Sequence, residues 1–171
     1  VGNPVYGFLD SGLLASFEPG DQRAVEWIGS YMNAGSVFYY PAKYKVNVST
    51  NLTEYYNVFR IAEEYLIRAE ARNEQQNIIG AAVDLNVIRA RAGLAPTDAS
   101  DYASMQLAIE NERRHELFCE WGNRWFDLKR TGKASEVLSF IKPGWQANDT
   151  LYPIPQIELN SNPFLTQNPG Y

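Results

Sequence analysis

The chain has 171 residues, of which 45% are hydrophobic and 20% are charged, as in one globular domain with a buried core. Its net charge of −5 and isoelectric point near 4.9 argue against nucleic acid or an anionic membrane surface as a partner, because both need clustered basic residues. A single cysteine, Cys119, excludes an internal disulfide, and no apolar run approaches the ~18 residues of a membrane span.

Residues 1–52 are rich in glycine and proline and show little periodicity. We expect loops here with short helical or strand pieces, including strands at 37–40 and 44–48. Segments of this kind often carry binding residues on a more regular scaffold.

Residues 53–95 have the periodicity of two helices. We expect the first to begin at Thr53 and to pair Arg60 with Glu64, and the second to run over 78–92 with Gly93 ending it. A polar turn between them predicts an antiparallel pair of the tetratricopeptide kind. Because a lone repeat cannot bury its own face, the pair needs neighbouring elements.

Residues 96–171 predict further helices followed by an irregular end. The expected helices run over 100–121, resume after Gly122 as far as Arg130, and cover 135–141. The prolines of residues 151–171 predict a segment without helix, an extended strap held to the surface by its apolar side chains.

Chemical motifs are weak. The acidic pairs at 63–64 and within 110–120 are interleaved with arginines, which favours a salt-bridged helix face over acid–base catalysis. His115 and Cys119 nearly match a zinc-protease pattern, but the chain has only one histidine to supply a ligand set. The sequence therefore predicts no catalytic residue, no metal and no cofactor.

The aromatic residues of the first third form the best candidate binding site. Sugar rings have apolar faces and hydroxyl rims, so their sites combine flat aromatic side chains with polar groups. An alternative is that these rings fill a small core beneath the loops. The candidate platforms and their polar partners are Trp27, Tyr31, Tyr39 and Tyr40, with Asp21 and Arg23.

Several motifs lie in order along residues 53–171. They are the segments 59–71, 85–94, Glu112 to Leu117 (ERRHEL), Glu120 to Arg130 (EWGNRWFDLKR), 151–155 (Leu-Tyr-Pro-Ile-Pro), 162–163 (Asn-Pro) and 167–171 (Gln-Asn-Pro-Gly-Tyr). In this order they resemble the motifs of the SusD/RagB family.

The resemblance implies an all-α superhelix of tetratricopeptide-like pairs with irregular insertions and an extended carboxyl-terminal strap. Family members are several-fold longer, so residues 1–171 would be one part of a single domain, with 1–52 on the ligand side, 53–95 as the helix pair and 96–171 as the final helices and strap.

The resemblance also implies a function without covalent chemistry. Such proteins capture oligosaccharides, sometimes peptides, at the outer face of the bacterial outer membrane, where a lipid upstream of these residues would anchor them. They deliver the ligand to a SusC-like TonB-dependent transporter.

Two other functions stay open from the residues alone. A tetratricopeptide-like adaptor that binds peptides would bury its surplus aromatic residues, and a glycoside hydrolase would hold two carboxylates ~5–10 Å apart in a cleft.

Overall fold

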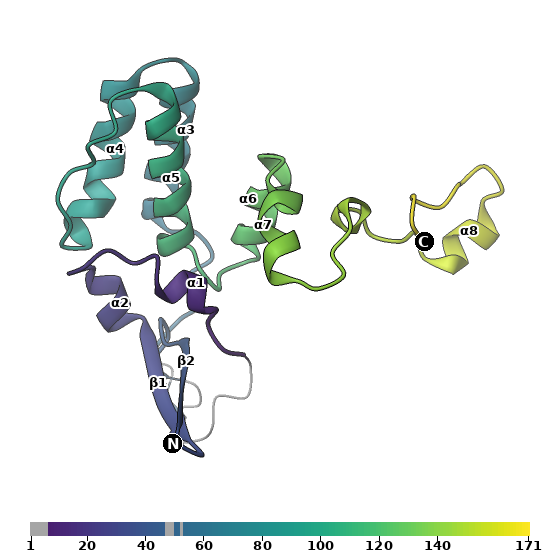
Figure 1. Cartoon of the computed structure of the whole chain (residues 1–171), viewed down its shortest axis with the longest axis horizontal. Helices are drawn as coiled ribbons and strands as arrows, with labels where there is room; N and C mark the ends of the chain where they lie inside the picture. Colours follow the sequence, from purple (N-terminus) through teal and green to yellow (C-terminus); the bar gives the residue numbers. More distant parts are fainter. Residues whose placement is uncertain (1–6, 47–49, 52) are drawn as a thin grey trace. The chain divides into compact units, whose positions relative to one another are not determined.

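The computed structural model describes residues 7–46, 50–51 and 53–171, and the chain divides into two compact units, Val1–Cys119 and Glu120–Tyr171. Among the described residues the fold is mainly helical with one two-stranded sheet (Figure 1), which confirms the predicted fold class. No helix in these described ranges is both long and apolar enough to cross a membrane.

The first unit begins with two short helices and a β-hairpin. Aspartate side chains cap both helices, since Asp10 and Asp21 accept hydrogen bonds from backbone N–H groups of the first turn. The elements are α1 (Ser11–Leu14), α2 (Gln22–Glu26), β1 (Ile28–Asn33) and β2 (Ser36–Pro41).

The hairpin strands are antiparallel and joined by Ala34 and Gly35, both with positive φ (47° and 83°), as a tight hairpin turn requires. Strand β2 confirms the strand predicted at 37–40. Strand β1 was not predicted. The strand predicted at 44–48 is wrong for residues 44–46, which have no strand structure, and residues 47–48 lie outside the described residues.

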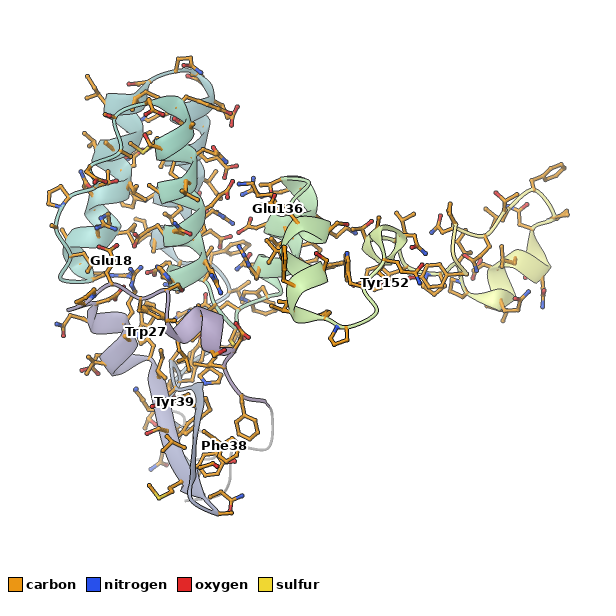
Figure 2. All side chains as sticks on the ribbon, in the orientation of Figure 1. Glu18, Trp27, Phe38, Tyr39, Glu136 and Tyr152 are labelled. Carbon is orange, nitrogen blue, oxygen red and sulfur yellow. The ribbon has the colours of Figure 1, made fainter. Side chains whose placement is uncertain are left out.

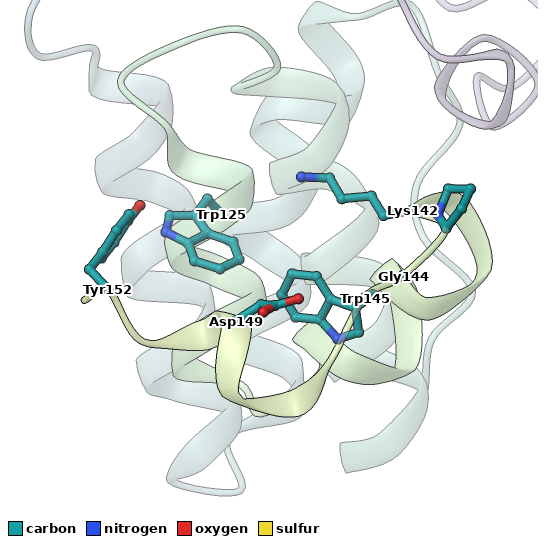
Figure 3. Close-up of a pocket in the computed structure, with 7 residues that line it drawn as sticks. Trp125, Lys142, Gly144, Trp145, Asp149 and Tyr152 are labelled. Carbon is teal, nitrogen blue, oxygen red and sulfur yellow. The ribbon is translucent and has the colours of Figure 1, made fainter. Parts of the chain in front are cut away.

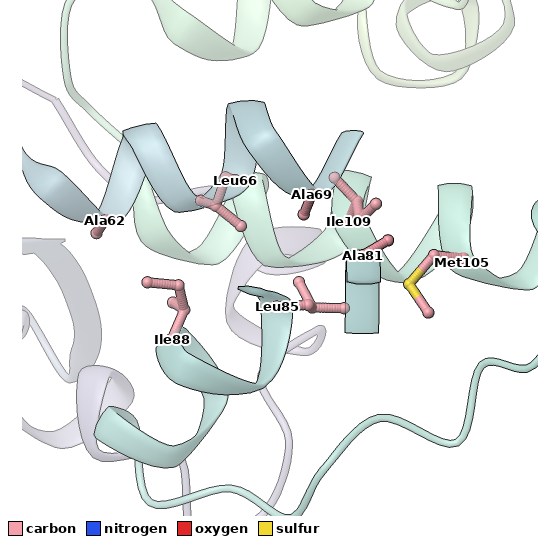
Figure 4. Packing of buried hydrophobic residues seen from close by; sticks show 8 residues of the cluster. All are labelled: Ala62, Leu66, Ala69, Ala81, Leu85, Ile88, Met105 and Ile109. Carbon is pink, nitrogen blue, oxygen red and sulfur yellow. The ribbon is translucent and has the colours of Figure 1, made fainter. Parts of the chain in front are cut away.

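Three helices form the body of the first unit, lying side by side (Figure 1): α3 (Ile61–Glu74), α4 (Ile78–Arg91) and α5 (Tyr102–Glu116). The predicted helix pair is present as α3 and α4, and α5 packs on both of them. Their shared core (Figure 4) consists of Ala62, Leu66, Ala69, Ala81, Leu85, Ile88, Met105 and Ile109. The pair therefore buries part of its apolar surface within this chain.

Helix α4 ends as its sequence predicts. Gly93 has a φ of +79°, and the N–H groups of Gly93 and Leu94 donate to the carbonyls of Ala90 and Arg89. This pair of hydrogen bonds is the Schellman motif, which satisfies the last carbonyls of the helix.

The predicted start of the first helix at Thr53 is wrong, because α3 begins only at Ile61. The preceding residues are held by side-chain hydrogen bonds instead of a helix ladder. The Glu54 carboxylate accepts from the N–H groups of Lys45 and Val46 at 2.7 and 2.6 Å, and Asn57 donates its N–H to the Tyr44 hydroxyl. Local bonds of this kind compete with helix formation.

The predicted ion pair between Arg60 and Glu64 is replaced by another. Arg60 lies just before the first turn of α3, where its guanidinium reaches Glu116 on α5 at 2.5 Å. A partner distant in the sequence thus takes the place of the one four residues away.

Helix α5 ends at Glu116, five residues before the predicted end at Trp121. Cys119, Trp121 and Gly122 all have positive φ, so the backbone turns away from the helical path. Cys119 is exposed rather than buried, and it does not lie one helical turn from His115. His115 and Cys119 therefore lack the helical turn that the zinc-protease pattern requires.

The second unit contains two helices that pack on each other and two shorter ones. Leu128, Ala134 and Leu138 form its small core, with Trp125 and Trp145 packed against it. The elements are α6 (Asn123–Arg130), α7 (Ala134–Ile141), η1 (Ala147–Thr150) and α8 (Gln156–Ser161).

Residues 151–171 contain the short helix α8, so the prediction that this segment has no helix is wrong. Pro155 precedes the first turn of α8, where its missing N–H costs nothing, and Pro163 follows the last turn. The segment is also held differently from the prediction, since Ile157 and Phe164 are exposed, Phe164 by 92%.

Hydrogen bonds rather than apolar contacts fasten the end of the chain. The Gln167 side chain accepts from the N–H of Ile154 at 2.8 Å and donates to its carbonyl at 2.9 Å. Asn168 donates to the Tyr152 carbonyl, and the Tyr171 hydroxyl donates to that of Leu151. The Gln-Asn-Pro-Gly-Tyr ending is thus bound to the Leu-Tyr-Pro-Ile-Pro run.

Candidate functional site

Asp21 and Arg23, the predicted polar partners of a ligand, are buried at the start of α2. The Arg23 guanidinium forms two hydrogen bonds with the Asp21 carboxylate, of 3.0 and 2.8 Å, and a third of 2.6 Å with Glu112 on α5. The side chains of Asp21 and Arg23 are 0% and 3% exposed. Their polar groups are therefore used inside the protein.

Two glutamates of α5 are the centre of this buried ion cluster. Glu116 accepts from Arg23, Arg60 and Arg91 at 2.5–3.2 Å, while Glu112 accepts from Arg23. Burial opposes the charge of Glu116, but hydrogen bonds from Arg91 and Arg60 outweigh it and lower its pKa. Burial raises the pKa of Glu112, whose arginine contacts do not compensate fully.

The ion cluster gives residues of the ERRHEL motif a structural role. Glu112, His115 and Glu116 lie on the face of α5 that receives the amino-terminal segment, since the His115 ring is 4.5 Å from that of Phe17 and its Nε2 is 2.9 Å from the Ser16 hydroxyl. Burial lowers the pKa of His115 to about 4. Among the described residues, no group of three or more His, Cys, Asp or Glu side chains could hold a metal ion.

The hairpin divides the predicted aromatic platforms between two faces. Phe38 and Tyr39 are neighbours in β2 and therefore lie on opposite faces (Figure 2). Tyr31 stands opposite Phe38 and stacks on it with ring centroids 5.5 Å apart, and Tyr40, opposite Gly29, lies on the same face. Tyr39 stands opposite Ser30 on the other face and is 41% exposed. The strand register thus brings Tyr31 and Tyr40 together and separates Tyr39 from them.

The ring of Tyr40 lies directly over Gly29. A Cβ at Gly29 would come within 2.4 Å of that ring, so no larger residue fits there without moving it. Phe8 packs on the same face, with its ring centroid 4.8 Å from that of Phe38 and 6.0 Å from that of Tyr31. This face is a partly buried aromatic layer, as the alternative of a small core beneath loops predicts for these rings.

Trp27 lies at the end of α2 and is surrounded by cations. Lys43, Arg60 and Arg91 lie over its ring with centroid distances of 4.7, 5.7 and 5.6 Å. Such contacts stabilise by about 0.5–2 kcal/mol each and fix the plane of the indole. Trp27 is half-buried, and its ring is partly occupied by the protein itself.

A second aromatic site, which the sequence did not predict, lies within the second unit (Figure 3). It is a hollow of about 420 Å³ lined by Trp125, Trp145 and Tyr152, with the Asp149 carboxylate and the Lys142 side chain beside them. Trp125 meets Trp145 edge to face at 6.2 Å and Tyr152 at 6.5 Å. Lys129 lies over both Trp125 and Tyr152, at 5.3 and 5.7 Å.

The local sequence explains how the hollow forms. Trp125 is on α6, and Gly144, with a φ of +84°, turns the chain after α7 so that Trp145 faces it. The indole N–H of Trp145 donates to Ser135 at 3.3 Å, and the N–H of Gln146 donates to Asp149 at 2.8 Å. The signal available in the sequence was a Pro-Gly turn between two tryptophans, followed by an acid and a tyrosine.

Comparison with known proteins identifies the family. The model of the SusD family matches residues 19–171, and the chain belongs to that family. This confirms the resemblance carried by the motifs.

Two relatives are SusD-like proteins of Formosa agariphila. One is 34% identical over 138 residues, covering 75% of this chain and 27% of the relative, and the other is 31% identical over 170 residues, covering 88% and 32%. The chain therefore spans about a third of the length of these relatives.

Two solved structures share this fold. A SusD superfamily protein from Parabacteroides distasonis superposes with a TM-score of 0.73 at 27% identity, over 96% of this chain and 42% of that one. The surface glycan-binding protein A from Bacteroides uniformis superposes with a TM-score of 0.69 at 26% identity, over 93% and 40%.

Proposed function

We propose that this chain is part of a cell-surface protein that binds glycans without cleaving them and delivers oligosaccharides to a SusC-like TonB-dependent transporter. The observation that carries the proposal is membership of the SusD family together with likeness to a surface glycan-binding protein. An upstream lipid anchor in the outer membrane belongs to the same proposal.

The arrangement of charges supports binding rather than catalysis. The acids Glu112 and Glu116 are 2% and 0% exposed and are bonded to arginines, so neither faces a cleft where a glycosidic bond could lie. A glycosidase needs one carboxyl group that gives a proton to substrate and a second that faces it.

In the proposed mechanism, exposed rings stack on the apolar face of a sugar while neighbouring polar groups bond its hydroxyls. Tyr39 is the exposed tyrosine of the hairpin that could stack on a sugar. Trp27, Tyr31 and Tyr40 stay candidates for the same role. Asp21 and Arg23 act through the fold, since they hold α2 and therefore the base of the hairpin in place.

A peptide-binding adaptor is the second candidate, favoured by one observation. Helix α3 carries an apolar hollow of about 530 Å³, lined by Ile61, Tyr65, Ile67 and the stems of Glu64 and Arg68. A hollow of this kind fits an apolar side chain of a peptide.

Titration calorimetry of the complete protein against panels of oligosaccharides and of peptides tests the proposal. We expect saturable heat with an oligosaccharide, and about tenfold weaker binding for Tyr39→Ala, a loss of ~1.4 kcal/mol. Tyr55→Ala removes a tyrosine outside the hairpin that is more exposed than Tyr39, 71% against 41%, and is the control. Saturable heat with peptides alone would favour the adaptor.

A further inference from the structure

We propose that the hollow of the second unit is a separate subsite for one neutral pyranose ring, formed by Trp125, Trp145, Tyr152, Asp149 and Lys142. This inference rests on the proposed glycan-binding function and adds a location and a ligand class to it. All five residues belong to one compact unit, so the hollow is formed within that unit.

The size and lining of the hollow fit a single sugar ring. Its volume of about 420 Å³ is within the range of small-molecule sites, about 300–1,000 Å³. Trp145 and Trp125 stand nearly perpendicular, at 80°, and both line the hollow. A pyranose has an apolar C–H face that packs on an indole plane and a rim of hydroxyls that needs polar partners.

The polar groups of the hollow are of the kind that bonds hydroxyls. The Asp149 carboxylate accepts one hydrogen bond, from the N–H of Gln146, and has further acceptor capacity. The Lys142 side chain is exposed and has no hydrogen bond or ion pair with any residue in the described part of the chain, and its ammonium supplies three donors. Asp149 beside the rings favours a neutral sugar, because a carboxylate or sulfate placed against it on the ligand would be repelled.

Trp125 adds a polar atom that lacks a partner. Its indole N–H is buried and meets no acceptor among the described residues. Figure 3 shows the nitrogen end of this ring pointing toward Tyr152. A buried donor without an acceptor is unfavourable, so an oxygen from solvent or from a ligand beside Tyr152 would satisfy it.

The rings are held in place before any ligand arrives. Lys129 lies over Trp125 and Tyr152, and Ser135 accepts from the indole of Trp145. Rings fixed in this way lose little freedom on binding, which favours affinity for a small ligand.

The test uses the complete protein with its tryptophan indoles labelled with ¹⁵N, titrated with methyl glucopyranoside, methyl galactopyranoside and methyl glucuronide. Concentrations up to about 50 mM detect even a dissociation constant of ~1 mM. We expect the Trp145 indole signal to shift saturably with at least one neutral glycoside. Asp149→Asn should weaken that binding about tenfold, as loss of a charged hydrogen-bond partner does.

Phe140→Ala is the matched control, because Phe140 is an exposed aromatic residue of the same unit outside the hollow. It should leave the dissociation constant within about twofold of the parent value. Lys142→Met replaces an exposed side chain after α7. It provides a second measurement of weakened binding if Asp149→Asn fails to fold.

Absence of any Trp145 shift with the neutral glycosides would overturn the subsite, as would an equal dissociation constant for the parent, Asp149→Asn and Lys142→Met proteins. A response to the glucuronide alone would overturn the assignment to a neutral sugar. The oligosaccharide calorimetry judges the proposed function separately, because binding there with no Trp145 shift rejects only this subsite.

Discussion

Arg23 connects the start of α2 with α5 through one guanidinium. It bonds Asp21 beside it in the chain and Glu112 and Glu116 on α5. Because these side chains are almost fully buried, each charge depends on the others for compensation. The residues that looked like ligand contacts in the sequence thus hold the amino-terminal segment on the helices.

Arg23→Ala should lower the free energy of unfolding by about 3–5 kcal/mol, because it leaves buried carboxylates without their cation. Arg91→Ala also removes a partner of Glu116, but the Arg91 side chain is 47% exposed, so we expect a loss of about 1 kcal/mol or less. Urea unfolding of both variants measures the difference. Equal losses would contradict a buried role for Arg23.

His115 should make stability depend on pH. Its pKa of about 4 in the folded protein lies below the ordinary 6.5, so between these values the unfolded chain binds a proton that the folded chain does not. The free energy of unfolding should therefore fall as pH falls, by about 2 kcal/mol between pH 7 and pH 5 from this group.

Urea unfolding at both pH values measures this effect, and His115→Gln is the control. The variant should lose most of the slope, because glutamine does not titrate. An unchanged slope in His115→Gln would assign the pH dependence to the carboxylates of the cluster instead.

At the scale of elements, hydrogen bonds to distant residues decide where a helix begins and how the carboxyl-terminal segment is held. Residues 53–60 stay out of α3 because Glu54 bonds residues 45 and 46. The chain end is fastened by Gln167, whose amide pairs with both backbone groups of Ile154. Gly170 is needed nearby, since its φ is +95° and a Cβ there would lie 1.6 Å from the Asn148 amide nitrogen.

Gln167→Ala should loosen the chain end without unfolding the core of its unit. We expect the Ile154 amide to exchange with solvent about tenfold faster or more, because loss of a hydrogen bond of about 1.4 kcal/mol has that effect. Gln156→Ala is the control, because the Gln156 amide donates to Asn160 within α8. Hydrogen exchange followed by mass spectrometry compares the two, and equal rates at residue 154 would contradict the clamp.

At the scale of the whole molecule, the net charge of −5 and the exposed apolar side chains act in opposite directions. The outer faces of α3 and α4 leave Ile61 and Ile79 77% and 82% exposed, and such side chains favour association. Charge repulsion opposes association at neutral pH and vanishes near the isoelectric point.

Association of this chain should therefore be greatest near pH 4.9. Dynamic light scattering between pH 7 and pH 4.5 should show the hydrodynamic radius rising as the isoelectric point is approached. The double variant Ile61→Ser and Ile79→Ser should show a smaller rise. A radius independent of pH in the parent chain would contradict the explanation.

The sequence by itself determined the helical class, the end of α4 at Gly93, and the family. It also placed the helices predicted at 78–92 and 135–141 within one residue of their observed bounds, 78–91 and 134–141. Periodicity and a C′ glycine are local signals, so they can be read from neighbouring residues. Only the tertiary structure decided that Asp21 and Arg23 are buried, that Tyr39 is separated from Tyr31, and that two tryptophans twenty residues apart share one hollow. Strand register, burial and long-range ion pairs depend on which distant residues meet, and that information is not local in the chain.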